Sequence, residues 1–348
     1  MLEIMRGCIR GCRFCQAGVI YRPTREHSVE YLKNYAKVML DITGAEEISL
    51  SSLSSSDYRG LKELLDFLIE YTSERGINIS LPSLRIDAFS LDVMKKVQDV
   101  KKSSLTFAAE AGTQRLRDVI NKGITEENII NGSREAFQGG WNKVKLYFML
   151  GLPTETDDDI RGIGELCEKV AEEYYRIPKS ERIGKVQITA SSSFFVPKPF
   201  TPFQWAAMLP EEEYLRRAYL TKDHIRAQLN QKSIRYQYHD ADVTILEGVF
   251  ARGDRRVCKV IETAYASGAL YDAWSDQFKK DVWMNAFESC GIDYTFYIPW
   301  DFIDCGVTKE FLKREWKIAH QDKISPNCRE ACLGCGAKKF GGGVCFEN

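Results

Sequence analysis

The stretch RGCIRGCRFCQAG, residues 6–18, contains three cysteines in the spacing CxxxCxxC. Cys8, Cys12 and Cys15 place three thiols on one short loop, and Gly7 and Gly11 allow the backbone to turn tightly around a small group. Thiolates bind iron–sulfur clusters and structural zinc. A four-iron cluster normally takes four cysteines, so a loop with three leaves one iron open for a substrate or cofactor. The spacing therefore predicts a reactive iron–sulfur site, with a zinc loop or three unrelated cysteines as the alternatives.

Composition sets the broad class of the protein. The 348 residues are 44% hydrophobic, which is enough for a substantial core, and this length suggests about two domains. The 48 basic and 49 acidic residues nearly cancel, so no global field points to nucleic acid or to a membrane. No apolar run is long enough to span a bilayer, and the first residues resemble a strand, not a leader peptide. Eleven cysteines without a secretion signal indicate metal binding in a reducing cytoplasm.

Short apolar or β-branched runs alternate with amphipathic stretches from residue 2 to about residue 196. Such alternation indicates βα units with parallel strands. Six strands are expected, at residues 2–6, 47–51, 77–81, 104–109, 143–150 and 185–196. Helices are expected between them, at residues 29–42, 58–75, 91–100 and 155–175, with two more inside 113–137. Six units fit an α/β fold with a partial (β/α)6 TIM-like barrel, in which ligands lie at the C-terminal strand ends.

The pattern changes after VPKPFTPFQW, residues 196–205. Helices are expected at 209–231 and 244–266, with a short strand at 234–239 and no βα rhythm. The chain is therefore expected to divide into a core barrel, a helix-rich extension and a cysteine-rich tail, at residues 1–205, 206–304 and 305–348.

The tail repeats the CxxxCxxC spacing in Cys328, Cys332 and Cys335. Cys345 or Cys305 supplies a fourth thiolate, and four thiolates can close a metal site. The tail is therefore expected to hold either an auxiliary iron–sulfur cluster or tetrahedral zinc, with a tail that binds no metal as the third case.

The N-terminal cysteines, which directly follow the first strand with Phe14 before the last of them, resemble the radical S-adenosylmethionine (radical SAM) superfamily. The resemblance implies that Cys8, Cys12 and Cys15 hold a [4Fe–4S] cluster, that S-adenosylmethionine chelates its open iron, and that Phe14 lies beside this cofactor. It implies reductive cleavage of S-adenosylmethionine to a 5′-deoxyadenosyl radical, which abstracts hydrogen from a substrate. Such an enzyme is oxygen-sensitive and needs an electron donor such as flavodoxin or ferredoxin.

The resemblance implies contacts with S-adenosylmethionine from segments that follow the second and third strands. SLSSLSSSD stands where the superfamily often has a Gly-Gly-Glu-like segment at the methionine amino group, so Ser52 and Ser54 are the expected contacts. The serines depart from that pattern. In LPSLRIDAF, Arg85 is a further expected polar contact.

Later segments continue the resemblance. AAEAGTQRLRDVINKG resembles a stretch in which Glu110 meets the ribose hydroxyls and Lys122, or Arg117, faces the carboxylate. FMLGLPTET resembles the segment beside the adenine, where Gly151 and Pro153 shape the backbone.

Within the superfamily, the chain resembles a poorly characterised group that is often built behind a cobalamin-binding-like domain. The match includes YRPTREHS, VPKPFTPFQW, ARGDRRV and the terminal cysteines. No cobalamin-binding-type segment precedes Cys8 in this sequence, so we expect either a fragment of a longer protein, with cobalamin bound by another domain or partner, or an enzyme that works without it. Relatives with this layout often modify RNA or ribosomal protein, which favours a macromolecular substrate.

Two other function classes stay open. A methyl- or methylthio-transferase would use the tail cluster or an added cobalamin. A non-catalytic interaction protein would use both cysteine groups to bind structural metal.

Overall fold

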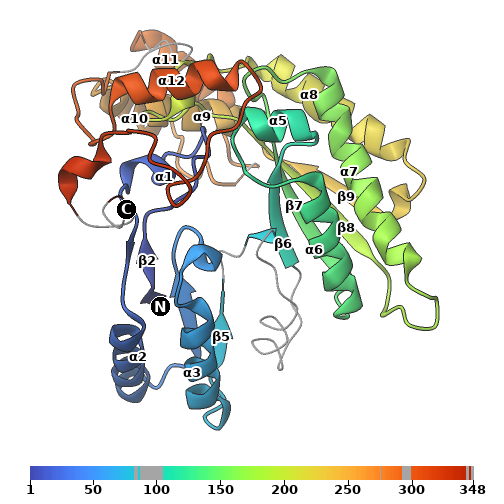
Figure 1. Ribbon diagram of the computed structural model, residues 1–348. Helices are drawn as coiled ribbons and strands as arrows, with labels where there is room; N and C mark the ends of the chain where they lie inside the picture. The colour runs from blue at the N-terminus through green and yellow to red at the C-terminus, as the bar shows by residue number, and fades with distance from the viewer. Residues whose placement is uncertain (82–84, 87–104, 275, 292–298, 342–344, 346–348) are drawn as a thin grey trace.

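The structure is a computed structural model that describes residues 1–81, 85–86, 105–274, 276–291, 299–341 and 345. Parallel strands in two groups form its centre, and helices lie on the outer side of both groups (Figure 1). Each group buries its own apolar core between strands and helices, as the alternation in the sequence predicts.

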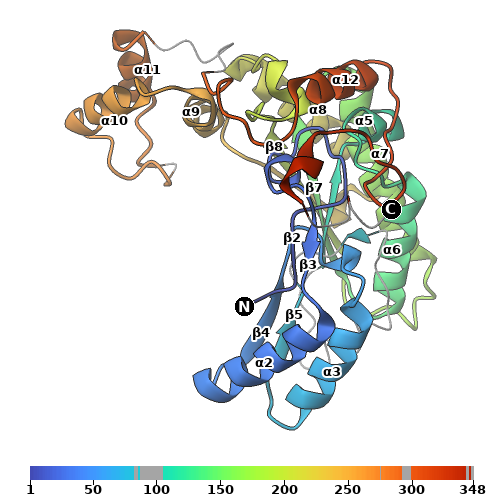
Figure 2. The same ribbon diagram turned by 60° about the vertical axis from the view of Figure 1, so that its left-hand side comes forward.

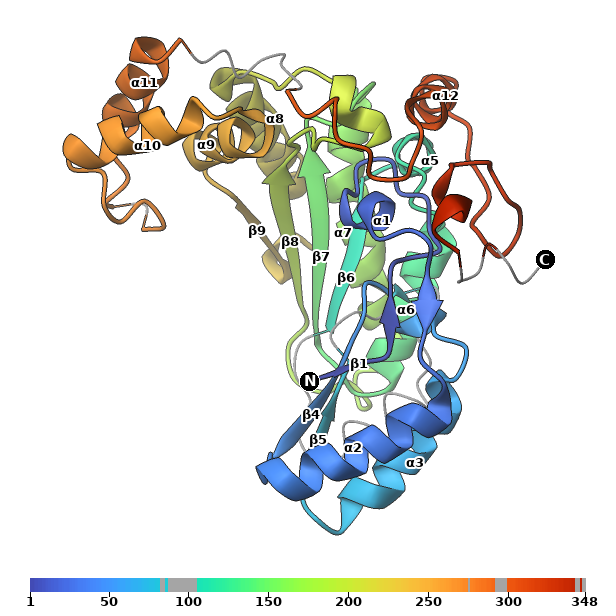
Figure 3. The ribbon, with the colours of Figure 1, turned by 90° about the vertical axis from the view of Figure 1, so that its left-hand side faces the viewer.

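The N-terminal group has three parallel strands in the spatial order β1 (Leu2–Glu3), β4 (Glu47–Ser51) and β5 (Asn78–Ser80). Two helices, α2 (Val29–Thr43) and α3 (Leu61–Ser73), cover one face of these strands (Figure 3). Leu32 and Leu64 on these helices are fully buried and share one core with Ile48 of β4. A small antiparallel pair, β2 (Met5–Arg6) and β3 (Arg25–Glu26), leads from β1 to the cysteine loop.

The second group has four parallel strands in the spatial order β6 (Leu105–Glu110), β7 (Lys143–Leu150), β8 (Gln187–Phe194) and β9 (Ile234–Tyr238). Its outer face is covered by α6 (Glu126–Gln138), α7 (Asp157–Arg176) and α8 (Glu211–Arg226). Thr125 and Thr156 start α6 and α7 with capping boxes, which satisfy backbone N–H groups that a helix leaves unpaired at its start.

The remaining helices lie beyond the second group of strands or at the C-terminal strand ends. A separate lobe with its own apolar core contains α9 (Ala241–Arg252), α10 (Val257–Ala266) and α11 (Lys280–Ser289) (Figure 2). The chain then returns through α12 (Lys309–Ala319), which packs beside α1 (Ala17–Ile20) and α5 (Gln114–Val119). Short 3-10 helices occur at Ser55–Asp57, Pro202–Trp205, Gln231–Ser233 and Ala337–Phe340.

The α/β fold with a partial TIM-like barrel is confirmed, and the six expected strands occur within a few residues of their predicted positions. The helix expected at residues 91–100 lies outside the described residues. The expectation that βα rhythm ends near residue 205 is wrong, because β9 pairs in parallel with β8 and adds a seventh strand. The strand itself was expected at residues 234–239, but its pairing with β8 was not.

The single helix expected at residues 244–266 is also wrong. The chain forms α9 and α10 with a break that begins at Gly253, whose backbone is extended. A Cβ at Gly253 would lie 2.6 Å from the carbonyl oxygen of Val249, so this close turn requires glycine. Over the part of the chain that is described, we find no helix with the length and apolar character that a membrane crossing needs.

Candidate active site

The cysteine loop, residues 7–16, connects β2 to α1 at the C-terminal ends of the strands. Gly7 has a φ of 87°, and a Cβ there would lie 2.6 Å from the carbonyl oxygen of Tyr21. The backbone N–H of Arg10 donates to Sγ of Cys8, and that of Gly18 donates to Sγ of Cys15, each at 3.4 Å. These contacts orient sulfur atoms by backbone geometry, as a cluster-binding loop requires.

The three thiols of the loop are close enough to influence one another's pKa. Burial raises the pKa of Cys8 to about 12, and the neighbouring Cys12 thiol adds to this. Burial followed by Cys12 also raises the pKa of Cys15. Partly buried thiols that repel one another as anions become thiolates most readily when a bound cation offsets their charge. The donor set therefore fits an iron–sulfur cluster.

No group of three or more His, Cys, Asp or Glu side chains converges on a point suited to one metal ion within the described ranges. A four-iron cluster does not need such convergence, because its cysteines bind different irons.

Glu110 and Lys122 form an ion pair beside these thiols. Glu110 ends β6 at an irregularity in the pairing with β7 and has a φ of 66°. Nζ of Lys122 donates to Oε1 of Glu110 at 2.9 Å, and the side chains are 12% and 15% exposed, respectively. Burial lowers the pKa of Lys122, but Glu110 and the Cys12 thiol more than offset this effect, so the net shift is upward. The two residues therefore present a charged pair next to the cysteine loop.

The serine segment after β4 is held by a carboxylate that the sequence analysis did not single out. Ser54 is buried and donates to Oδ2 of Asp57 at 2.6 Å. Arg10, inside the cysteine loop, donates to both oxygens of Asp57 at 3.0 and 2.6 Å. The Ser52 hydroxyl lies 3.1 Å from the Ser55 hydroxyl and is partly exposed. Of the two expected serines, Ser52 is therefore the more accessible.

The two arginines considered for the cofactor occupy different settings. Arg85 reaches the same region and donates to the carbonyl oxygens of Lys122 and Gly123 at 3.2 and 3.3 Å. Arg117 is fully buried and donates to the carbonyl oxygen of Ala111 at 2.9 Å, within the turn that follows β6. Arg117 therefore shapes this turn, and Lys122 is the basic side chain that lies beside the thiols.

Phe14 packs against an apolar cluster at the ends of β6, β7 and β8, which includes Ala111, Leu152 and Phe195. Gly151, directly after β7, has a φ of 91°, and a Cβ there would lie 2.8 Å from Cε1 of Tyr214. Pro153 is half-buried in the turn that follows. The expected adenine segment is thus a tightly shaped turn near Phe14.

Glu155 fixes that turn. Its Oε2 accepts the backbone N–H of Gly151 at 2.8 Å and also pairs with Arg217 of α8. Glu155 and Asp159 belong to an acidic run at the start of α7, yet both carboxylates are buried and paired with arginines.

One tail cysteine, Cys328, contacts the same loop through its backbone. The backbone N–H of Cys328 donates to the carbonyl oxygen of Ile9 at 3.0 Å. Burial raises the pKa of Cys345, and the thiols of Cys328, Cys335 and Cys332 add to this, so these four thiols lie within electrostatic reach of one another. Cys305 packs against the same apolar cluster around α12 that contains Cys335, but its thiol is not among those that raise the pKa of Cys345.

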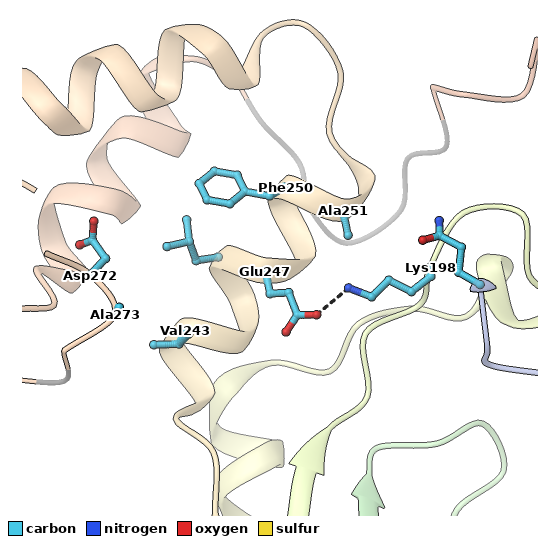
Figure 4. A pocket seen from close by; sticks show the side chains of 9 residues that line it. Lys198, Val243, Glu247, Phe250, Ala251, Asp272 and Ala273 are labelled. Carbon is cyan, nitrogen blue, oxygen red and sulfur yellow. Dashed lines mark hydrogen bonds and ion pairs between the residues drawn. The ribbon is translucent and has the colours of Figure 1, made fainter. Parts of the chain in front are cut away.

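A cavity of about 660 Å³ lies between α9 and the segment that follows β8 (Figure 4). It extends to Gln16, the residue after Cys15, and is bordered by the ion pair of Lys198 with Glu247 and by Phe250. A smaller cavity of about 260 Å³ is bordered by Arg10, Gly11 and Lys122. Both cavities therefore reach the immediate neighbourhood of the cysteine loop.

Sequence reasoning missed four side chains that hold this region together, namely Arg13, Asp57, Asn121 and Glu155. Arg13 is fully buried although it stands between two cysteines in a polar motif. No periodicity signals these contacts, because the partners come from distant segments. The one sequence signal for the burial of Arg13 was its position between two cysteines of a metal-binding motif.

Comparisons with known proteins agree with this geometry. Residues 2–167 match the Radical SAM superfamily. Uncharacterized protein MJ0966 of Methanocaldococcus jannaschii is 34% identical over 292 residues, which are 84% of this chain and 60% of that protein. Uncharacterized methyltransferase PH0819 of Pyrococcus horikoshii is 26% identical over 171 residues, which are 49% of this chain and 36% of that protein.

Among solved structures, the radical S-adenosylmethionine methyltransferase TsrM of Kitasatospora setae, with cobalamin and a [4Fe–4S] cluster bound, is similar to 83% of this chain. The match covers 60% of TsrM with a TM-score of 0.48 and 10% identity, and it supports no assignment of function. The chain spans between 36% and 60% of the length of these three proteins. The superfamily match includes the cysteine loop and the strands β1 to β7. Residues 2–167 of this chain are therefore similar to the radical SAM superfamily.

Proposed function

We propose that this chain carries out radical SAM chemistry at the cysteine loop, with Cys8, Cys12 and Cys15 as the ligands of a [4Fe–4S] cluster. The observation that carries the proposal is the position of the Glu110–Lys122 pair beside these thiols at the C-terminal strand ends. When bound, the cluster supplies the electron that cleaves S-adenosylmethionine to methionine and a 5′-deoxyadenosyl radical, which abstracts hydrogen from the substrate. An electron donor such as flavodoxin or ferredoxin would load that electron.

The chain's own residues would bind and orient S-adenosylmethionine. Lys122 would attract the carboxylate, since a buried ammonium group binds an anion more strongly than an exposed one. Glu110 would accept hydrogen bonds from the ribose hydroxyls, and Ser52 would contact the amino group. Phe14 and the turn at Gly151 and Pro153 would border the adenine and exclude water. Ser54 and Arg85 would act through their hydrogen bonds at the edge of this site.

We assign a second metal to the tail, with Cys328, Cys332, Cys335 and Cys345 as its ligands. Their mutual electrostatic influence supports this set over one that includes Cys305. Four thiolates suit either an auxiliary iron–sulfur cluster or zinc. The tail at residues 305–348 stays a separate segment in this proposal, whereas the core extends beyond residue 205, because β9 belongs to its second group of strands.

The substrate would approach through the cavity between Gln16 and α9, because this cavity connects the lobe of α9 to the cysteine loop. RNA or a ribosomal protein is the substrate class that we favour, in a reducing, cytoplasmic setting. All eleven cysteines fall in described positions, and none forms a disulfide, which suits that setting.

A second candidate function is methyl or methylthio transfer, aided by the tail cluster or by cobalamin bound on another domain or partner. The similarity to a protein named as a methyltransferase favours it. It predicts a product that carries a new methyl or methylthio group in addition to 5′-deoxyadenosine.

The test is 5′-deoxyadenosine formation by protein purified and assayed without oxygen, with dithionite as reductant. Wild type and Cys258→Ser are expected to form it, because Cys258 is exposed on α10. Cys12→Ser is expected to form none. Equal formation by Cys12→Ser and wild type would contradict the proposal.

A further inference from the structure

Arg13, between Cys12 and Cys15, is held by two distant parts of the chain. Its side chain is 0% exposed. Its guanidinium donates to the carbonyl oxygens of Val119 at the end of α5 and of Lys323 after α12, each at 2.9 Å. It also donates to the Glu315 carboxylate at 3.2 Å and to the Ser325 hydroxyl at 3.1 Å. A buried guanidinium with this many acceptors has one orientation available to it.

Glu315 of α12 is the anionic partner of Arg13. Its side chain is 4% exposed, and its Oε2 also accepts the Ser325 hydroxyl at 2.8 Å. Its Oε1 is buried and has no hydrogen-bond partner among the residues that the structure describes. A buried carboxylate is costly unless a cation compensates it, so Arg13 and Glu315 depend on each other.

The same C-terminal segment contacts the backbone of the cysteine loop directly at one further point and through Asn121 at another. Cys328 donates from its N–H to the carbonyl oxygen of Ile9 at 3.0 Å. Asn121 donates from Nδ2 to the carbonyl oxygen of Gly11 at 3.1 Å and accepts the N–H of Ser325 at 2.9 Å. Every contact falls on a residue between the three cysteines, so the segment braces the loop and leaves its ligands free.

We propose that Arg13 and Glu315 are positioning residues that fix the cysteine loop and set the reduction potential of the cluster it holds. The inference rests on the proposed function and deepens it. Reduction adds negative charge to the cluster, and a buried cation nearby favours the reduced state more than the oxidised one. Arg13 therefore raises the potential, and Glu315 lowers it by compensating Arg13. The C-terminal segment thereby takes part in the chemistry of the N-terminal site.

The test compares Arg13→Gln, Glu315→Gln and Glu310→Gln in the full chain, after anaerobic reconstitution. The cluster potential is measured by a dithionite titration followed by electron paramagnetic resonance, with iron counted for each protein. Glu315→Gln is expected to shift the potential upward and Arg13→Gln downward. Glu310→Gln, on the exposed side of the same helix, is expected to leave it unchanged.

Potential shifts of opposite sign in Arg13→Gln and Glu315→Gln distinguish this role from simple support of the fold. If the two residues only supported the fold, the direction of the shift would not depend on the sign of the charge removed. If Arg13→Gln does not fold, Arg13→Lys keeps the charge and is expected to hold less iron at a potential near that of wild type, while Glu315→Gln still reports the sign. Equal potentials, or shifts in one direction, would overturn the inference although wild type binds iron. Wild type without iron would overturn the proposed function and this inference together.

Discussion

Two cysteine groups with the same CxxxCxxC spacing have different surroundings. The N-terminal group follows a strand, begins at a constrained glycine and lies beside a partly buried Glu–Lys pair. The tail group follows α12 in irregular backbone, with Cys332 exposed and Cys335 buried in an apolar cluster. Spacing alone therefore predicts a metal-binding loop, and the residues around the loop indicate which reaction it could support. We expect catalysis at the first group and an auxiliary or structural metal at the second.

The largest contrast is expected between two cysteines of the tail. Cys345→Ser is predicted to lose the whole tail metal, about four irons or one zinc, because the Cys345 thiol is within electrostatic reach of the other three. Cys305→Ser is predicted to retain it, because the Cys305 thiol is not among the groups that shift the pKa of Cys328 or Cys345. Metal analysis of both proteins decides this. Loss of the tail metal in Cys305→Ser and its retention in Cys345→Ser would make Cys305, and not Cys345, the fourth ligand.

The next contrast is between two Lys–Glu pairs. Lys122→Met is predicted to weaken S-adenosylmethionine binding by about 10- to 100-fold, the effect of one charge-assisted hydrogen bond, with iron content unchanged. Lys169→Met removes an exposed pair with Glu126 on the outer helices and is predicted to have no effect. Isothermal titration calorimetry of the iron-loaded proteins measures both. Equal affinity in Lys122→Met and wild type would exclude Lys122 from the cofactor site.

A third contrast compares one glycine from each group. Gly7→Ala is predicted to destabilise the protein by about 3 kcal/mol, because φ is positive and the new Cβ would clash with a backbone oxygen. Gly334 has a φ of 62°, but an added Cβ there would meet no atom within 4 Å among the described residues. Gly334→Ala is therefore predicted to destabilise the protein by only about 1 kcal/mol. Urea unfolding of metal-free protein gives both values. A smaller effect for Gly7→Ala than for Gly334→Ala would contradict the description of the loop.

The smallest effect concerns acid stability near the first group. Burial raises the pKa of Asp57, but hydrogen bonds from Arg10 and Ser54 outweigh it and hold that pKa below its usual value. Such a group stabilises the folded state above its unfolded pKa of about 4 and loses this contribution as pH falls. Metal-free wild type is therefore predicted to lose stability on acidification below about pH 4, and Asp57→Asn to lose less of it. Identical pH profiles of unfolding free energy would contradict this account.

The fold could be predicted from the sequence wherever buried apolar residues recur at the spacing of a helix or a strand. Helix caps at Ser28 and Thr125 and the strand at residues 143–150 follow from local patterns. The seventh strand was missed as a sheet member because its pairing with β8 is a tertiary contact. The positions of the cysteines, Glu110 and Lys122 followed from motifs and resemblance.

The ion pairs that hold the site together could not be predicted in the same way. Arg13 and Glu315 are separated by 302 residues, and Arg10 and Asp57 by 47. Each is a charged residue that composition alone would place on the surface. Their burial depends on which distant segment supplies the opposite charge, and one sequence carries no signal of that choice.

The most direct test of the central claim is the count of iron, labile sulfide and zinc per chain after anaerobic purification. Wild type is compared with the Cys8/Cys12/Cys15→Ala protein and with Cys328/Cys332/Cys335→Ala as its matched control. The first triple variant is predicted to lose about four irons and the control to retain about four. Zinc without iron in wild type, or equal iron in wild type and the first variant, would contradict a radical SAM site at the N-terminal loop.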